Sequence, residues 1–292
     1  MIQQHEVNQQ IKPLPSEGLR VSFAKILVAT DFSKASDRAL EHALSLARTY
    51  NSRIFLAHVI PVNLMMAETF RGQMRRAARE GMERILTSGC FVGVAHREII
   101  EEGTLWPNIE ALIKMHEIDL VVLGTHGMGF VRKLVIGSSA EEIFRQARIP
   151  LLTVGPTVER DPLYGIELKN ILLATSLGMG AERQAAFAFS LAQEHRSRIT
   201  FLHVQQHPVQ EQAIVDELQK LVPSVTDLHC LPLFRVERGD PVKEILRVAR
   251  QIHADLIVLG AKARKGLAGH VPHTKAYQVV CGAPCPVLTI KS

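Results

Sequence analysis

The sequence predicts an α/β protein made of two tandem, doubly wound domains, each with a five-stranded parallel sheet covered by helices on both faces. One observation is that short apolar, β-branched runs alternate with amphipathic segments of helical length, as in parallel sheets with helical crossovers. The other is an internal repeat. Segment 25–30 returns as 170–175, and segment 119–124 returns as 255–260.

The spacing of the repeat places the individual strands. The first two strands of the copies are offset by 145 residues and the last two by 136, so the second copy lacks nine residues between its second strand and its third helix. We expect strands near 25–30, 53–59, 94–100, 119–123 and 150–154, and again near 169–175, 198–204, 231–237, 255–259 and 286–290.

The first helix and the domain boundaries follow from local signals. Apolar residues recur at helical spacing from Ala39 to Ala47, after a cap at either Ser33 or Ser36. We expect a polar leader over 1–22, a first domain over 23–155, a linker over 156–168 and a second domain over 169–292.

Composition disfavours several classes of function. A net charge of +5 is spread evenly over both halves and aromatic content is 5%, which argues against specific nucleic-acid binding. No apolar run is long enough to span a membrane and no secretion signal is visible, so we expect a cytoplasmic protein. Cys281 and Cys285 have neither redox nor zinc-knuckle spacing. Arg71, Arg75 and Arg79 fit a solvated helix face better than an interaction patch.

One loop carries the strongest chemical signal. Gly124, Gly127 and Gly137-Ser138 follow the apolar run 120–123 in the pattern G-x2-G-x9-G-S. Glycines allow backbone N–H groups to approach an anion closely, and a helix N-terminus adds unpaired donors. The same residues also have a structural interpretation, because 138–141 reads as a capping box.

With Asp31 placed after the first strand, these motifs resemble the universal stress protein family, and the resemblance covers both copies from residue 25 onward. It implies a flavodoxin- or Rossmann-like strand order of 3-2-1-4-5, with Asp31 close to the glycine loop at the carboxyl ends of the first and fourth strands. It also implies that the two fifth strands pair and make the chain an internal pseudo-dimer. A further homodimer is left open.

The resemblance implies ATP, or alternatively AMP or ADP, in the first domain, and leaves open whether Mg²⁺ accompanies the phosphates. Asp31 would contact the ribose or the base edge, because a carboxylate repels phosphates. The backbones of Ala29, Thr30, Val59 and Leu123 would surround the adenosine. The phosphate end would be formed by Gly124, His126, Gly127, Gly137, Ser138 and Ser139. We interpret His58 and His203 as packed or capped, not as ligands.

The second copy departs from the motif. Ser176 replaces Asp31, and Ala263, His273 and Thr274 stand at the positions of Gly127, Gly137 and Ser138. ATP binding is therefore expected in the first domain only. Residues 256–292 contain no acidic side chain but include Lys262, Arg264, Lys265, Lys275 and Lys291. A solvated basic loop is favoured over a site for another anion.

Three functions follow. The favoured one is a nucleotide-binding regulatory protein of the stress response. A slow ATPase or phosphotransferase is weaker, because the sequence has no G-x4-G-K-S/T motif and shows no evident general base. The third is a scaffold or sensor whose basic second domain binds a different anionic ligand or a protein partner.

Overall fold

The computed structural model describes residues 23–62, 67–125, 137–158, 167–206, 210–222, 232–261 and 274–291. The first half contains β1 (Lys25–Ala29), α1 (Lys34–Tyr50), β2 (Arg53–Ile60), α2 (Glu68–Thr87), β3 (His96–Glu102), α3 (Leu105–His116), β4 (Leu120–Gly124), α4 (Ser138–Gln146) and β5 (Leu151–Val154). The second half contains β6 (Asn170–Ala174), α5 (Ala181–His195), β7 (Arg198–Gln205), α6 (Glu211–Lys220), β8 (Leu233–Arg238), α7 (Pro241–Gln251), β9 (Leu256–Ala261), α8 (Lys275–Gly282) and β10 (Val287–Lys291).

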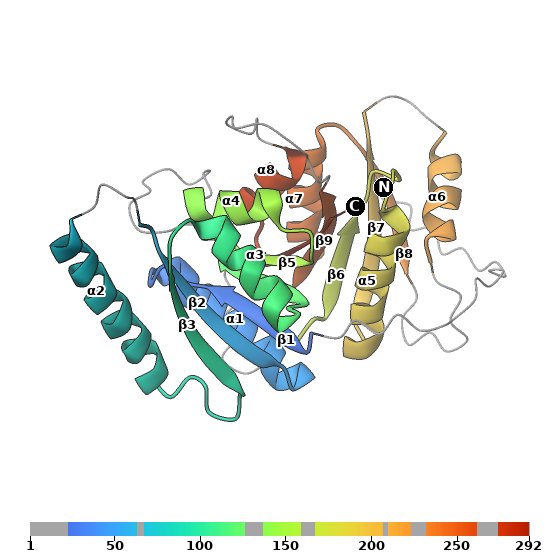
Figure 1. Ribbon diagram of the computed structural model, residues 1–292. Helices are drawn as coiled ribbons and strands as arrows, with labels where there is room; N and C mark the ends of the chain where they lie inside the picture. Colours follow the sequence, from blue (N-terminus) through green and yellow to red (C-terminus); the bar gives the residue numbers. More distant parts are fainter. Residues whose placement is uncertain are drawn as a thin grey trace.

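All ten strands form one sheet in the order β3-β2-β1-β4-β5-β10-β9-β6-β7-β8. Each half is parallel and repeats the order 3-2-1-4-5 in its own numbering, which confirms the predicted fold class. The crossovers put helices on both faces of the sheet (Figure 1). One face packs against α1, α2, α5 and α6, and the other against α3, α4, α7 and α8.

Side chains alternate between these two faces along each central strand. In β1, Ile26 and Val28 join the core beneath α1, whereas Leu27 joins the core on the opposite side. All three are fully buried. Because both faces are covered, the central strands are apolar throughout, which explains why the sequence showed them as continuous apolar runs.

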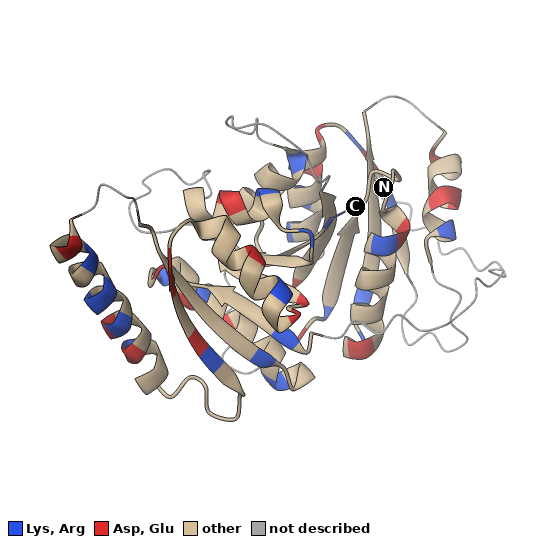
Figure 2. Ribbon diagram, viewed as in Figure 1, with Lys and Arg blue, Asp and Glu red and all other residues tan. Residues whose placement is uncertain are grey.

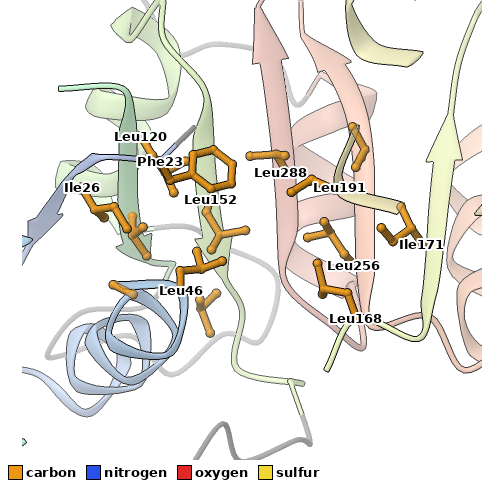
Figure 3. Close-up of a cluster of buried hydrophobic side chains, with 14 of the residues drawn as sticks. Phe23, Ile26, Leu46, Leu120, Leu152, Leu168, Ile171, Leu191, Leu256 and Leu288 are labelled. Atoms are coloured by element: carbon orange, nitrogen blue, oxygen red, sulfur yellow. The ribbon is translucent and has the colours of Figure 1, made fainter. Parts of the chain in front are cut away.

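The halves join through the antiparallel pair β5–β10. Leu152 pairs with Leu288, and these two residues occupy equivalent positions in the repeat, so a pseudo-twofold axis passes between them. The buried apolar side chains continue across this boundary without a break (Figure 3). The last residues of α1 and α5, Tyr50 and His195, also occupy equivalent positions in the repeat and contact each other. Tyr50 Oη lies 2.8 Å from His195 Nε2.

Two details of the sequence prediction are resolved. Ser33, not Ser36, caps α1, because its hydroxyl accepts from the backbone N–H of Ser36. The missing stretch of the second copy shortens its second crossover, where α6 has 10 residues and α2 has 20.

The arginine stripe of α2 is paired with acidic side chains. Arg75 forms ion pairs with Glu68 and with Glu102 of β3, and Arg71 also contacts Glu68. Several basic residues and a smaller number of acidic ones lie along this helix (Figure 2). The predicted solvated face fits this pattern.

Candidate functional site

The carboxyl ends of β1, β2 and β4 lie side by side. Ala29 pairs with Ala57 on one side and with Leu123 on the other, both in parallel register. Residues that follow these strands therefore emerge at the same edge of the sheet, where open α/β sheets bind ligands. Six of the predicted site residues lie here: Ala29, Thr30, Asp31, Val59, Leu123 and Gly124.

Asp31 begins a tight turn between β1 and α1. Its carboxylate accepts from the backbone N–H of Ser33 at 3.1 Å, and the side chain is exposed. The next residue, Phe32, has a left-handed backbone with φ of 62°. The Thr30 hydroxyl accepts from the N–H of Phe32 at 3.0 Å and donates to the Ser36 hydroxyl, which fixes this unusual conformation.

Neighbouring elements hold the Phe32 ring in place. The imidazole of His58 lies 4.4 Å from it, centroid to centroid. On α2, Gly81 leaves no space for a side chain, since a Cβ atom there would lie 2.8 Å from the ring. The turn that presents Asp31 is therefore clamped between β2 and α2.

His58 serves the same turn. Its Nδ1 lies 2.8 Å from the carbonyl oxygen of Thr30, and in the second half His203 Nδ1 lies 3.0 Å from that of Thr175. A carbonyl partner requires Nδ1 to carry the proton. Both histidines thus have structural partners, as we interpreted from the sequence.

Gly124 has a packing role that the sequence did not reveal. A Cβ atom at this position would come within 2.3 Å of the carbonyl oxygen of Ala35 in the first turn of α1. Glycine is therefore required for the close approach of α1 to the end of β4. The retained Gly260 also lacks room for a side chain, but its neighbour is movable: a Cβ atom there would lie 2.1 Å from the side-chain nitrogen of Gln184, not from backbone.

The start of α4 lies beside the end of β4. The backbone N–H of Gly137 donates to the carbonyl oxygen of Thr125 at 2.8 Å, while the N–H of Thr125 donates to Val154 of β5. Gly137 is the N-cap and Ser138 the first helical residue, so 138–141 does not form the capping box that the sequence allowed. Ser138 and Ser139 are both exposed. Neither hydroxyl is used as the cap of this helix.

The corresponding helix of the second half is closed by its own side chain. The hydroxyl of Thr274, the counterpart of Ser138, accepts from the N–H of Tyr277 at 3.2 Å and caps α8. Ser176 is exposed where Asp31 stands in the first half, and Leu177 takes the left-handed conformation of Phe32. The two edges thus share a backbone design but present different chemistry.

Four positions of the predicted motif lie outside the described residues. They are His126 and Gly127 in the first half, and Ala263 and His273 in the second half. The basic residues Lys262, Arg264 and Lys265 lie outside as well. The structure brings together the strand-end residues and the 137–139 segment, and is silent on the loop between them.

The acidic side chains explain which end of a nucleotide would suit this edge. Burial raises the pKa of Asp37 in α1, Arg84 opposes this, and the charge of Asp31 adds to the rise. Asp31 therefore makes its surroundings unfavourable for a second negative charge. Phosphates would be disfavoured beside β1 and favoured at the start of α4, where backbone donors gather.

Other site types find no support in the described part of the chain. No group of three or more His, Cys, Asp or Glu side chains there could hold a metal ion. Among the same residues, Cys90, Cys281 and Cys285 are not joined in a disulfide. No helix within the described ranges is both long and apolar enough to cross a membrane.

Sequence reasoning missed two supporting residues, Gly81 and Thr125. Gly81 makes room for Phe32, and Thr125 bonds to both Gly137 and Val154. Gly81 stands in no recognisable motif, and Thr125 occupies a position that the glycine motif leaves unspecified. The one signal for Thr125 is that it sits between the motif glycines, immediately after Gly124.

The fold is that of a tandem α/β protein in which each half has a sheet edge of the kind where open α/β sheets bind ligands. In the first half this edge carries an acidic turn and a helix N-terminus without a side-chain cap. The family model for the universal stress protein family matches residues 22–155 and 233–291, which together make up more than half of the chain. The chain belongs to the universal stress protein family.

Individual relatives agree with this assignment. A universal stress protein of Mycolicibacterium smegmatis is 26% identical over 298 aligned residues, covering 91% of this chain and 96% of the relative. One from Methanocaldococcus jannaschii is 25% identical over 140 residues, covering 45% of this chain and 82% of the relative. Among solved structures, a universal stress protein of Archaeoglobus fulgidus DSM 4304 aligns with a TM-score of 0.73 at 18% identity, covering 93% and 99% of the two chains. This likeness shows the same fold over both halves.

Proposed function

We propose that the protein binds an adenine nucleotide in its first half only, and that it acts as a regulatory protein of the stress response in the cytoplasm. ATP is the first candidate, with AMP and ADP as alternatives. Adenosine would lie at the ends of β1, β2 and β4, near Asp31, and the phosphates would lie at the start of α4. Residues 22–155, which the family model matches without interruption, include this whole region.

The observation that carries the proposal is the difference between the two helix starts. In α4 the exposed Ser138 and Ser139 leave the first-turn donors uncapped by a side chain, whereas in α8 the Thr274 hydroxyl occupies that position. An uncapped helix start beside a fixed carboxylate can recognise a ligand that carries hydroxyls at one end and phosphates at the other.

Regulation would follow if nucleotide binding shifts the equilibrium between two conformations of the protein. A bound nucleotide shifts an equilibrium only if it binds two states unequally. The loop between β4 and α4 and the turn at Asp31 would both contact the ligand. We therefore expect the bound and free states to differ in how these two segments are arranged.

The first experiment asks what the full-length protein carries. Small molecules released from the purified protein are identified by mass spectrometry, and thermal melting is repeated with added ATP, ADP, AMP and GTP. A ligand present at about 100 times its dissociation constant adds about 2.7 kcal/mol to the free energy of unfolding. We expect stabilisation by adenine nucleotides and little by GTP.

Matched variants locate the site. Asp31→Asn and Gly127→Val should weaken binding, because the first removes an ionic acceptor and the second places a branched side chain where backbone must approach phosphate. The equivalent changes in the other half, Ser176→Ala and Ala263→Val, serve as controls. A crystal soaked in ATP with the nucleotide in the second half, or in neither half, would contradict the proposal.

The alternative of slow ATP hydrolysis is tested in the same samples. Nucleotide recovered intact after long incubation supports a binding protein, whereas steady release of ADP above a protein-free control supports an ATPase. The scaffold alternative, a different anionic ligand in the basic second half, predicts that Lys262, Arg264 and Lys265 replaced together change the ligand or partner profile.

A further inference from the structure

A lysine of the second half is buried against α4 of the first. Lys291 is the last residue of β10 and only 5% exposed. Its Nζ donates to the carbonyl oxygen of Phe144 at 2.6 Å and lies 4.8 Å from the centroid of the Phe144 ring. Burial lowers the pKa of Lys291 to about 8. At neutral pH the side chain is therefore a buried cation at the last turn of α4.

The equivalent contact across the pseudo-twofold axis is different. Gly155 stands at the position of Lys291, and Val280 at that of Phe144. A Cβ atom at Gly155 would lie 3.3 Å from the carbonyl oxygen of Val280, so backbone alone fills this space. A buried ammonium thus meets α4, the helix with the open start, whereas the cation at the end of α8 is the guanidinium of Arg250, which donates to the carbonyl oxygen of Gly282 at 3.4 Å in an exposed contact.

Two further contacts involve this pair, one to Lys291 and one to Phe144. Arg183 of α5 donates from its guanidinium to the carbonyl oxygen of Lys291 at 3.4 Å. On the other side of α4, the ring of Tyr277 in α8 packs edge-on against Phe144 at 6.4 Å. The two helices lie close together near the middle of the molecule (Figure 1). Lys291 and Phe144 therefore connect three elements of the second half to a single helix of the first.

The contact between Lys291 and Phe144 matters because α4 is a short helix. α4 has nine residues and depends on tertiary contacts for its stability. A cation at the C-terminal carbonyls complements the helix dipole, as an anion does at the N-terminus. Phe144 lies six residues after Ser138, a separation of about 9 Å along the helix axis. A charge at one end and a phosphate at the other would stabilise the same helix.

We propose that Lys291 of the second half is a positioning residue for the phosphate end of the nucleotide site in the first half. This inference rests on the proposed function. Lys291 holds the last turn of α4, and thereby fixes where Ser138 and Ser139 present their donors. The second half, which lacks the motif itself, would in this way set the phosphate affinity of the first.

Stability alone does not explain a lysine at this position. Burying a cation carries a desolvation penalty, and an apolar side chain of similar length is often as stable or more so in such a place. Lys291→Met should therefore leave stability close to that of the wild type, because the desolvation penalty that it removes offsets the lost bond to the Phe144 carbonyl, while it weakens phosphate recognition. A purely structural lysine would show the opposite pattern, with lower stability and equal losses for every ligand.

The test compares full-length wild type with Lys291→Met and Lys291→Gln by titration calorimetry and by urea unfolding. The ligands are ATP and adenosine. We expect Lys291→Met to weaken ATP binding by roughly 3- to 10-fold and adenosine binding by less than twofold. Lys291→Gln, which keeps a donor for the Phe144 carbonyl but not the charge, should fall between the wild type and the Met variant.

Thr157→Val is the matched control. The Thr157 hydroxyl donates across the same interface to the carbonyl oxygen of Ala283 at 2.5 Å, but that residue is the C-cap of α8. Its loss should leave ATP affinity unchanged. Wild-type ATP affinity in Lys291→Met, or equal losses for ATP and adenosine, would overturn the inference while the proposed function stands. A wild-type protein that binds no adenine nucleotide would overturn both.

Discussion

Gly124 illustrates how a motif residue can be explained by packing. It is the first glycine of the predicted phosphate loop, yet the carbonyl oxygen of Ala35 occupies the space where its side chain would be. The survival of Gly260 in the half that lost the other glycines fits this explanation. A glycine that both halves keep is thus weaker evidence for a ligand than one that only the first half keeps.

Gly124→Ala should destabilise the first half, because the added methyl group forces α1 away from the end of β4. We expect a loss of about 1–3 kcal/mol in the free energy of unfolding, measured with urea. Gly72→Ala is the matched control in α2, where no heavy atom lies within 4 Å of the added group. That change should be neutral or stabilising by up to about 1 kcal/mol. Equal losses in the two variants would contradict the packing argument.

Asp119 gives the stability a pH dependence. It precedes β4 and accepts from the backbone N–H of Lys25 at 3.1 Å, but burial raises its pKa from 3.8 to about 6. The folded state therefore holds this proton more tightly than the unfolded state. The stabilisation is complete below pH 4 and is lost as the pH rises through about 6.

The corresponding variant is Asp119→Asn, which keeps an oxygen acceptor for Lys25 but cannot ionise. Between pH 4 and 6 the wild type should lose about 1–2 kcal/mol relative to this variant, because one pKa unit corresponds to about 1.4 kcal/mol and solvent screens part of the shift of this half-buried carboxyl. Urea unfolding at several pH values measures the difference. Parallel pH profiles for the two proteins would exclude Asp119 as the source.

At the scale of elements, the strands were predictable because the central ones are buried on both faces and therefore apolar throughout. The edge strands begin two residues later in the structure than the sequence predicted. The sequence predicted 94–100 and 231–237, whereas the structure has β3 at His96–Glu102 and β8 at Leu233–Arg238. Edge strands are half exposed and rich in charged residues, so their ends carry little hydrophobic signal.

Helix starts show what sequence patterns cannot distinguish. The sequence 138–141 satisfies the capping-box pattern, but the helix begins one residue earlier than that pattern requires, with Gly137 as the N-cap. Which residue becomes the cap depends on the hydrogen bond between Gly137 and Thr125, which ties the helix start to β4. That contact is set by the chain path and leaves no mark in the local sequence.

The two helix starts should respond in opposite ways to loss of a hydroxyl. Ser138→Ala with Ser139→Ala should lower ATP affinity with little change in stability, because neither hydroxyl caps α4. Thr274→Ala should leave ATP affinity unchanged and cost about 1 kcal/mol, because it removes the cap of α8. Calorimetric titration and urea unfolding of both variants provide the comparison. A large loss of stability in the serine variant would mean that these hydroxyls serve the helix.

At the scale of the whole molecule, the repeat and the family resemblance gave the strand order and the pairing of β5 with β10, and the structure confirms both. The convergence of Asp31 with the start of α4 follows from that order. The placement of nucleotide there stays a prediction. The sequence grouped Lys291 with a solvated basic loop, which is wrong for this residue: it is buried, and its partner Phe144 lies 147 residues away in the other half.

The β5 edge, where the two halves join, should also pair with β5 of a second copy. All four residues of β5 are buried, and its partner strand belongs to the other repeat. A fragment of residues 23–158 would expose this edge, and exposed apolar edges pair with another chain. We expect the fragment to form a homodimer through β5, as measured by analytical ultracentrifugation. Leu152→Lys in the fragment should prevent association, and a monomeric unmodified fragment would contradict the expectation.

The symmetric junction between the halves also affects how the protein can evolve. In a dimer of identical chains, every substitution appears twice, so a change that suits one site alters its mate as well. Here the covalent link between repeats lets Lys291 face Phe144 while Gly155 faces Val280. If the proposed function holds, one copy can recognise the ligand while the other supports it, which an assembly of identical subunits cannot do.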